Sequence, residues 1–157
     1  MNKNIKQLTL VIIHRNDRVL LGMKKRGFGA GKWNGFGGKV VPGESILAAA
    51  ERELREEAGI VAKAMEKHGV LTFVFPDNPT LLEVHVFRAE EWSGEPTESE
   101  EMRPQWFPVS LIPFPEMWSD DELWFPLLFA QKKFVGEFFF DNEEKISRYT
   151  LEERAEL

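Results

Sequence analysis

The sequence has no cysteine among its 157 residues. Disulfide bonds and thiolate chemistry are therefore excluded, and the redox state of the compartment is not constrained. The chain has three scattered histidines, His14, His68 and His85. Without cysteine, histidines at such spacing do not make a zinc site, and we interpret them as structural or surface residues.

Positive charge is also scarce. The chain carries 20 Lys and Arg against 26 Asp and Glu, which gives a net charge of −6. Binding along a nucleic-acid backbone needs clustered Lys and Arg, so the composition argues against a nucleic-acid polymer as substrate. A single nucleotide is still compatible with this charge, because metal ions can supply the local positive charge.

No run of the chain approaches the roughly 18 apolar residues of a membrane span, and residues 1–7 match neither a signal nor a transit peptide. We therefore expect a monomeric, cytoplasmic protein with no membrane partner, with mitochondrion or nucleus as further compartments in a eukaryote. The length, the 43% of hydrophobic residues and the lack of repeats or linkers predict a single domain spanning residues 1–157.

The most informative stretch spans residues 38–60. Pro42-Gly43 predicts a turn, and Ser45 is well placed to cap a helix. Residues 46–58 contain neither Gly nor Pro and are rich in strong helix formers, and Gly59 can close the helix in a left-handed conformation. Spacing by three and four predicts an apolar face of Leu47, Ala50, Leu54 and Ala58.

A second stripe on this helix consists of three glutamates, Glu53, Glu56 and Glu57. Like charges at this spacing destabilise an isolated helix by roughly 0.2–0.5 kcal/mol per pair. Three carboxylates on one stripe suit a hard divalent cation with oxygen ligands, Mg²⁺ above all, with Mn²⁺ as a substitute. The ordinary alternative is a solvated acidic helix face.

The rest of the chain mixes strands and a second helix irregularly, which predicts an α+β fold or an α/β/α sandwich. Ser119 followed by Glu122 has the spacing of a capping box and predicts a helix over residues 122–132, with Pro126 tightening its first turns. Alternating or β-branched runs predict strands at residues 8–14, 18–25, 61–66, 69–75, 81–89, around 106–107, 134–140 and 146–149.

Taken together, Gly38, Glu44, the run Arg52-Glu53-Leu54, the pair Glu56-Glu57 and Gly59-Ile60 resemble the Nudix box with its defining positions filled. The resemblance implies an α/β/α sandwich, a Nudix fold with a mixed β-sheet between helices. It also implies a loop and helix that hold metal against a pyrophosphate. In this reading Glu44 and Arg52 brace the motif structurally.

The blocks 20–31 and 33–40 extend this likeness, as do Val84-His85-Val86-Phe87 and Trp124-Phe125-Pro126. They resemble the animal MutT-homologue oxidised-purine nucleoside triphosphatases. This subfamily hydrolyses 8-oxo-dGTP and 2-hydroxy-dATP to monophosphates, and methylated purine nucleotides are further candidates. The sequence departs from the subfamily at Ser119, where proline is usual, and at Leu82, where methionine is frequent.

The resemblance also implies the site. The metal ligands fall on the Gly37 carbonyl, Glu53, Glu56, Glu57 and Glu101, with Glu53, Glu56 and Glu57 as catalytic residues. The substrate contacts fall on Thr9, Lys24, Phe28, Asn34, Phe36, Gly37, Gly38, Lys39, Phe73, Phe75, Leu82, Met102, Trp118, Ser119, Asp120 and Asp121. Several of these also have ordinary interpretations, such as core packing for Phe73 and Phe75 or helix-dipole contacts for Asp120 and Asp121.

The reaction we expect is metal-assisted attack of water on a nucleoside triphosphate, with Glu56 or Glu53 as the general base. Two alternatives remain. One is a Nudix hydrolase for ADP-ribose or dinucleoside polyphosphates. The other is a non-catalytic nucleotide sensor, a class that usually loses the carboxylates that this chain retains.

Overall fold

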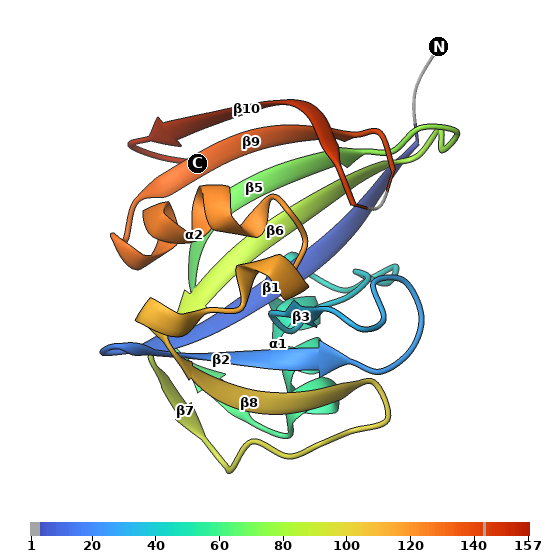
Figure 1. The fold of residues 1–157 in the computed structure, drawn as a ribbon. Helices are drawn as coiled ribbons and strands as arrows, with labels where there is room; N and C mark the ends of the chain where they lie inside the picture. The colour runs from blue at the N-terminus through green and yellow to red at the C-terminus, as the bar shows by residue number, and fades with distance from the viewer. Residues whose placement is uncertain (1–3, 143) are drawn as a thin grey trace.

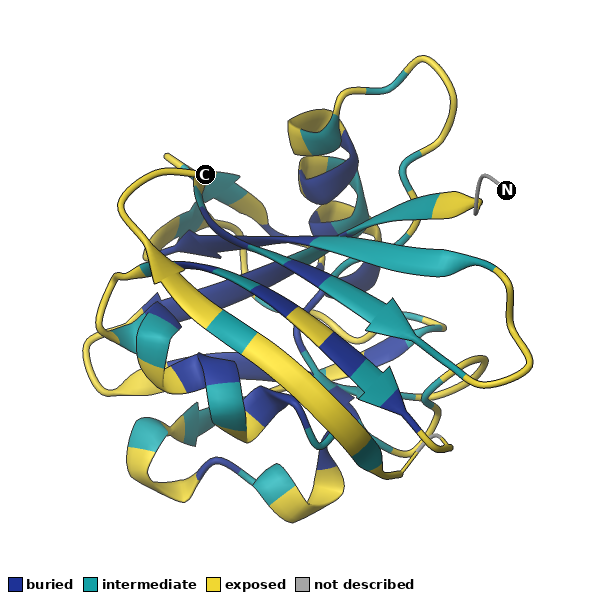
Figure 2. Ribbon diagram, turned by 90° about the horizontal axis from the view of Figure 1, so that it is seen from above, coloured by how far each residue is buried: buried dark blue, intermediate teal, exposed yellow. Residues whose placement is uncertain are grey.

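A computed structural model describes residues 4–142 and 144–157. In this part of the chain a mixed sheet lies between two helices, with α1 on one face and α2 on the other (Figures 1 and 2). The burial pattern in Figure 2 follows these layers, because the central strands are buried and the connecting loops are exposed. The predicted α/β/α sandwich is confirmed.

Over the described residues the main sheet has eight strands, in the order β10-β9-β5-β6-β1-β2-β3, with β8 pairing to β2. The pairs β1–β6 and β5–β9 are parallel, and the others are antiparallel. A separate antiparallel pair joins β4 to β7. The strands are β1 (Ile5–Arg15), β2 (Arg18–Lys24), β3 (Trp33–Asn34), β4 (Val61–Lys63), β5 (Glu66–Val74), β6 (Leu81–Ala89), β7 (Glu91–Ser93), β8 (Met102–Pro108), β9 (Lys133–Phe140) and β10 (Ile146–Arg154).

Three strand predictions differ from the structure. Residues 61–66 do not form one strand, because Ala64 has a φ of 49° and separates β4 from β5. The strand around 106–107 is longer than expected and spans β8. The last strand continues to Arg154, paired with β9 along its length, although most of its residues are exposed.

Helix α1 (Ile46–Ala58) has the predicted ends. The Ala48 N–H donates to the Ser45 hydroxyl at 3.1 Å, and Gly59, at φ 71°, closes the helix. Leu47 is 44% exposed, so it lies outside the buried face. That face packs on the sheet through Ala49, Ala50, Leu54, Glu57 and Ala58.

Helix α2 (Asp121–Phe129) follows two short 3₁₀ turns, η1 (Val109–Leu111) and η2 (Phe114–Glu116). The predicted capping box is wrong. Asp120 is the N-cap residue, without a side-chain capping bond, because its carboxylate instead accepts a hydrogen bond from the Trp124 indole at 2.7 Å. The helix also ends at Phe129, before residue 132, and Gln131 then turns the chain with a φ of 58°.

Two apolar cores fill the two faces of the sheet. The core on the α2 side includes Trp124, Phe125 and Phe138, and the core on the α1 side includes Leu54 and Phe36. In the described residues no helix is long and apolar enough to cross a membrane.

Candidate active site

The loop before α1 is pressed between strand β1 and the helix. The Gly37 N–H donates to the Glu57 carboxylate at 2.8 Å. A Cβ on Gly37 would lie 1.8 Å from the Thr9 carbonyl oxygen, and a Cβ on Gly38 would lie 2.6 Å from the Glu53 carboxyl carbon. The two glycines therefore let the backbone approach both β1 and the glutamates of α1, which is the contact expected of a loop that presents phosphate to a metal.

Arg52 forms hydrogen bonds with three acidic side chains of this region. Its Nε and Nη2 bind the two carboxylate oxygens of Glu44 at 2.7 and 3.0 Å. Its Nη1 donates to Glu53 at 2.8 Å and to Glu56 at 3.2 Å. Hydrogen bonding by Arg52 lowers the pKa of Glu44, and the bidentate geometry agrees with the bracing role that the resemblance implied.

Glu57 differs from its neighbours because its side chain is buried. Burial raises the pKa of its carboxyl to about 8, against the opposing effect of the Gly37 N–H. The charges of Glu53 and Glu101 raise it further, and Lys24 lowers it. These charge effects couple Glu57 to Glu53 of the same helix and to Glu101 in the loop before β8.

Glu101 is held by cations. The Lys24 ammonium binds one carboxylate oxygen at 3.3 Å, and the Arg26 Nε binds the other at 2.7 Å. Hydrogen bonding by Arg26, aided by Lys24, lowers the pKa of Glu101. Within the part of the chain that the structure describes, no three acidic or histidine residues are grouped closely enough to hold a metal ion.

The residues nonetheless fit a divalent cation. The donor set is made of hard carboxylate and carbonyl oxygens, the kind that Mg²⁺ and similar ions prefer. Glu57 is buried with a carboxyl that burial and like charges hold protonated, and a cation beside it would offset both effects. Arg52, Lys24 and Arg26 supply the positive charge at Glu53, Glu56 and Glu101 in this structure.

The second half of the site is aromatic. Phe28, Phe75 and Trp118 contact one another, with ring centroids 5.1 to 6.1 Å apart. Phe140 stacks on Phe75 at 5.0 Å and meets Trp118 at 6.0 Å. These rings come from four separate segments of the chain, and Phe28 remains 57% exposed. We call Phe28, Phe75, Trp118 and Phe140 the aromatic cluster. It is suited to hold a flat ring by stacking.

Asp120 and Asp121 follow Trp118 directly and are each 2% exposed. Burial raises the pKa of Asp120 to about 6, despite the hydrogen bond from Trp124. Burial and the charge of Asp120 raise the pKa of Asp121 well above its ordinary value. One oxygen of Asp121 has no hydrogen-bond partner among the described residues. The pair therefore holds a proton and retains unused hydrogen-bonding capacity for a ligand.

The other residues predicted to contact the substrate differ in their burial and in their neighbours. Phe73 packs on Phe138 and Phe140 at the edge of the aromatic cluster, and Leu82 is the cross-strand partner of Phe73. Phe36 and Met102 are buried in the α1-side core, and their contacts with substrate stay predictions. Both would contact a Cβ on Gly22 at 2.8 Å, so this glycine lets them meet beneath the sheet.

The remaining predicted residues surround the loop. The Thr9 hydroxyl lies 3.5 Å from the Gly38 backbone, and Asn34 accepts a hydrogen bond from the Gly35 N–H. Lys39 is exposed, and its carbonyl accepts from Arg52. The Ser119 hydroxyl is buried, with no partner in the described chain. Sequence reasoning missed Phe140, whose only signal was its alternation with Phe138 in β9.

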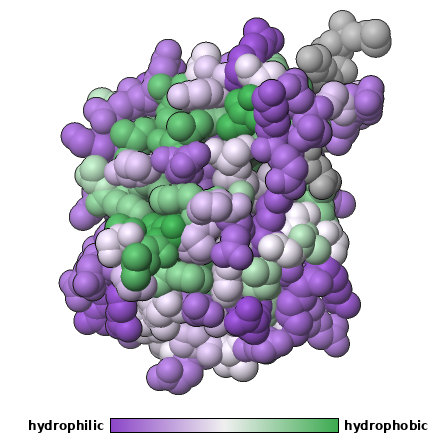
Figure 3. All heavy atoms as spheres, viewed as in Figure 1, coloured by the Kyte–Doolittle hydropathy of each residue, from purple (hydrophilic) through white to green (hydrophobic). Residues whose placement is uncertain are grey.

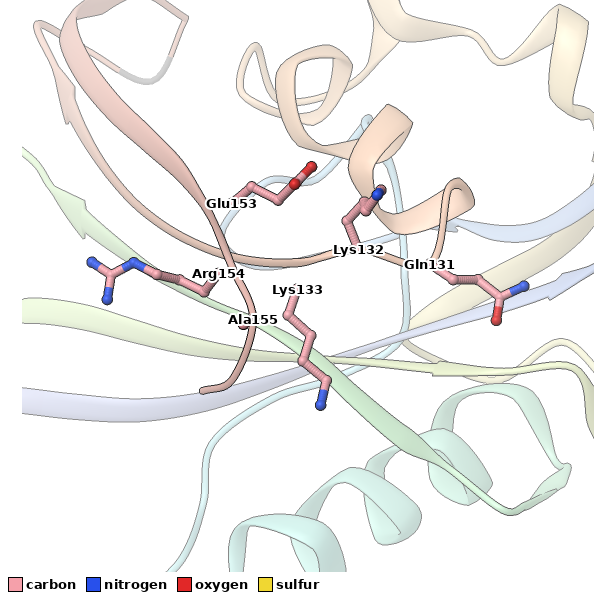
Figure 4. A pocket seen from close by; sticks show the side chains of 6 residues that line it. All are labelled: Gln131, Lys132, Lys133, Glu153, Arg154 and Ala155. Atoms are coloured by element: carbon pink, nitrogen blue, oxygen red, sulfur yellow. The ribbon is translucent and has the colours of Figure 1, made fainter.

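Two surface hollows are found in the described part of the chain, and the larger is lined in part by Ser119, one of the predicted substrate contacts. One of about 360 Å³ lies where β9 begins and β10 ends. Its side chains point away from one another, with Arg154 and Gln131 turned in opposite directions (Figure 4). The other, of about 570 Å³, runs from Ser119 along the start of β10. Figure 3 shows apolar atoms on the left of the face seen in Figure 1 and mainly hydrophilic or neutral atoms on the right.

The NUDIX domain family model matches residues 6–128. The chain belongs to the Nudix family. It is similar to two relatives named "Oxidized purine nucleoside triphosphate hydrolase". The one from Danio rerio is 54% identical over 152 residues, covering 97% of both chains. The one from Mus musculus is 54% identical over 145 residues, covering 92% of this chain and 93% of the relative.

A solved structure of a MutT protein from Bacillus halodurans superimposes on this Nudix chain with a TM-score of 0.84 at 30% identity. It covers 94% of this chain and 97% of the other. The family resemblance and the fold drawn from the sequence are thereby confirmed. Nudix hydrolases use divalent metal cations, which agrees with the oxygen-rich site described above.

Proposed function

We propose that this Nudix hydrolase converts oxidised purine nucleoside triphosphates, namely 8-oxo-dGTP and 2-hydroxy-dATP, to the monophosphate and pyrophosphate. The observation that supports this most strongly is the aromatic cluster, together with the buried pair Asp120 and Asp121 that follows Trp118 in the chain. The two relatives with matching names, 54% identical over nearly the whole chain, support the same substrate class.

We infer how the base is recognised from the aromatic cluster and the aspartate pair. The rings of Phe75, Phe140 and Trp118 provide stacking surface for a purine, which by itself does not distinguish one purine from another. Discrimination then falls to Asp120 and Asp121. A carboxylate only accepts hydrogen bonds, whereas a protonated carboxyl also donates, so a shared proton lets the pair match different base edges.

The phosphate side follows from the loop and α1. We propose Mg²⁺ as the cation, with Mn²⁺ as a substitute, held by the Gly37 carbonyl, Glu53, Glu56, Glu57 and Glu101. When bound, it neutralises phosphate oxygens and lowers the pKa of a bound water. Glu53 or Glu56, both of which accept hydrogen bonds from Arg52, is then the group that takes the proton of the attacking water.

A turnover panel tests this proposal. Purified protein is given 8-oxo-dGTP, 2-hydroxy-dATP, dGTP, ADP-ribose and a dinucleoside polyphosphate with Mg²⁺, and the products are identified. We expect the two oxidised purines to be preferred by kcat/KM. In ¹⁸O-water the label should enter the monophosphate, as attack at the α-phosphorus requires. A preference for ADP-ribose or the dinucleoside, or label in the pyrophosphate, would contradict the proposal.

A further inference from the structure

The loop of residues 25–32 contacts Trp118 in three places. The Phe28 ring lies 5.1 Å from the Trp118 ring, and the Lys32 ammonium lies 5.4 Å from its centroid. Between them, Gly29 has a φ of 83°, and a Cβ there would lie 3.1 Å from the indole nitrogen. Phe28 and Lys32 of this loop thus both contact the tryptophan ring, while Phe75 and Phe140 meet it edge-on.

Lys32 also reaches beyond the tryptophan. Its ammonium binds the Glu144 carboxylate at 2.9 Å, across 112 positions of sequence. The Lys32 side chain is only 17% exposed. Glu144 lies in the turn between β9 and β10, where its own N–H and that of Lys145 donate to the Asn142 side chain. Figure 1 shows the loop after β2 and this turn on the same side of the molecule.

We propose that Lys32 and Glu144 form a latch that holds Trp118 in place over the purine base, so that Lys32 is a positioning residue for substrate affinity. This inference rests on the proposed function, because it takes the aromatic cluster as the site where the base binds. Its physical basis has two linked parts. A cation over an indole face is attracted by the ring, and the ion pair fixes that cation at a turn that does not belong to the loop. Glu144 therefore acts on the base only through Lys32 and Trp118.

Four variants test the latch. Lys32→Met and Glu144→Gln should each raise KM for 8-oxo-dGTP, by about three- to ten-fold for the lysine and less for the exposed glutamate. The kcat of both should stay within about two-fold, because the Lys32 side chain contacts Trp118 and Glu144, away from the glutamates of α1. Lys32→Arg should keep the wild-type KM. Lys145→Met removes a positive charge, as Lys32→Met does, but from the turn that carries Glu144, and it should leave KM unchanged.

A double-variant cycle decides between the latch and a direct contact. If Lys32 and Glu144 act as one unit, the variant carrying both Lys32→Met and Glu144→Gln should have no higher KM than Lys32→Met alone. Dissociation constants for 8-oxo-dGMP, measured by calorimetry, should follow the same order. Glu144→Gln with wild-type KM, additive effects, or an equal rise in Lys145→Met would each overturn the latch.

These outcomes are separable from failure of the proposed function. If the wild-type protein does not hydrolyse oxidised purine triphosphates, the function is wrong, whatever the variants do. If the wild type hydrolyses them and the two single variants match it, the function stands and the latch is wrong. Thermal unfolding of each variant completes the experiment, because a lowered Tm with unchanged KM would assign the ion pair to stability alone.

Discussion

The two halves of the site treat their carboxyl groups in opposite ways. On the metal side, Arg52 lowers the pKa of Glu44, and Arg26 lowers the pKa of Glu101, so these groups stay ionised. On the base side, burial raises the pKa values of Asp120 and Asp121, and no cation of the described residues pairs with them. The ionised carboxylates of the first half attract positive charge. The carboxyl groups of the second half retain a proton, which can be donated to a neutral base.

Glu57 does not follow this division. It belongs to α1 with Glu53 and Glu56, yet burial raises its pKa as it does for the aspartates. A carboxyl of this kind gains most from a cation beside it, because the cation offsets both the burial and the neighbouring negative charges. The comparison therefore identifies Glu57 as the residue whose loss should most affect the metal side.

The largest effect is expected for Glu57→Gln. The amide oxygen can still accept from the Gly37 N–H, so the fold should be kept, but the negative charge for the cation is lost. We expect kcat to fall by roughly 100-fold or more, the scale of losing one charge-stabilising group. Steady-state kinetics with Mg²⁺ and circular dichroism would measure both consequences.

The matched control for this variant is Glu51→Gln, an exposed glutamate elsewhere on α1, which should keep wild-type turnover. Titration with Mn²⁺, followed by electron paramagnetic resonance, gives a readout independent of activity, and Glu57→Gln should bind the ion more weakly. Near-normal turnover of Glu57→Gln in Mg²⁺ would remove Glu57 from the metal site.

A smaller effect, but a more selective one, is expected on the base side. Asp120→Asn and Asp121→Asn each replace a titrating group by a fixed donor and acceptor. A hydrogen bond to a buried base edge contributes about 1–3 kcal/mol, so the kcat/KM ratio of 8-oxo-dGTP to 2-hydroxy-dATP should shift by roughly ten-fold or more. The two variants should shift this ratio differently.

Glu122→Gln is the control for this comparison, because Glu122 is an exposed acid in the same first turn of α2. It reports what the loss of one negative charge near the helix N-terminus does by itself. If Asp120→Asn and Asp121→Asn keep the wild-type ratio and lose only stability, the aspartates serve the helix and the aromatic rings alone select the base.

The two halves also differed in how far the sequence could predict them. The metal side is largely contiguous, so helix formers, the Ser45 cap and the Gly59 stop placed α1 at its observed bounds. The base side depends on tertiary contacts between distant segments. The rings of Phe28, Phe75, Trp118 and Phe140 come from four distant segments, and no local pattern indicates that they meet.

The same reason explains Phe36 and Lys32. Phe36 is part of the loop that the resemblance assigned to substrate, but the alternation of β1 and β2 and the gap left by Gly22 turn its ring into the α1-side core. Lys32, in the loop between β2 and β3, pairs with Glu144, in the turn between β9 and β10. These strands stand at opposite ends of the sheet order, so no local sequence pattern indicates the ion pair.

The smallest effect expected concerns stability and pH. Because the pKa values of Asp120 and Asp121 are higher in the folded than in the unfolded chain, the folded state binds more protons above about pH 4. Their contribution to stability is fully present below that pH. It is lost as pH rises through their folded pKa values, about 6 for Asp120. One such proton changes the free energy of unfolding by at most about 1.4 kcal/mol per pH unit.

Urea denaturation of metal-free wild type and Asp121→Asn between pH 4.5 and 7.5 would test this, in steps of roughly one pH unit. The free energy of unfolding of the wild type should fall more steeply with pH than that of the variant, because the amide carries no titrating proton and relieves the repulsion on Asp120. Glu57 has the same sign, and His14 and His85, whose pKa values burial lowers, have the opposite sign. All three are present in both proteins, so the difference between the two slopes belongs to the aspartate pair. Equal slopes would mean that the pair is ionised together at neutral pH, and the distinction between the two halves of the site would then rest on the aromatic rings alone.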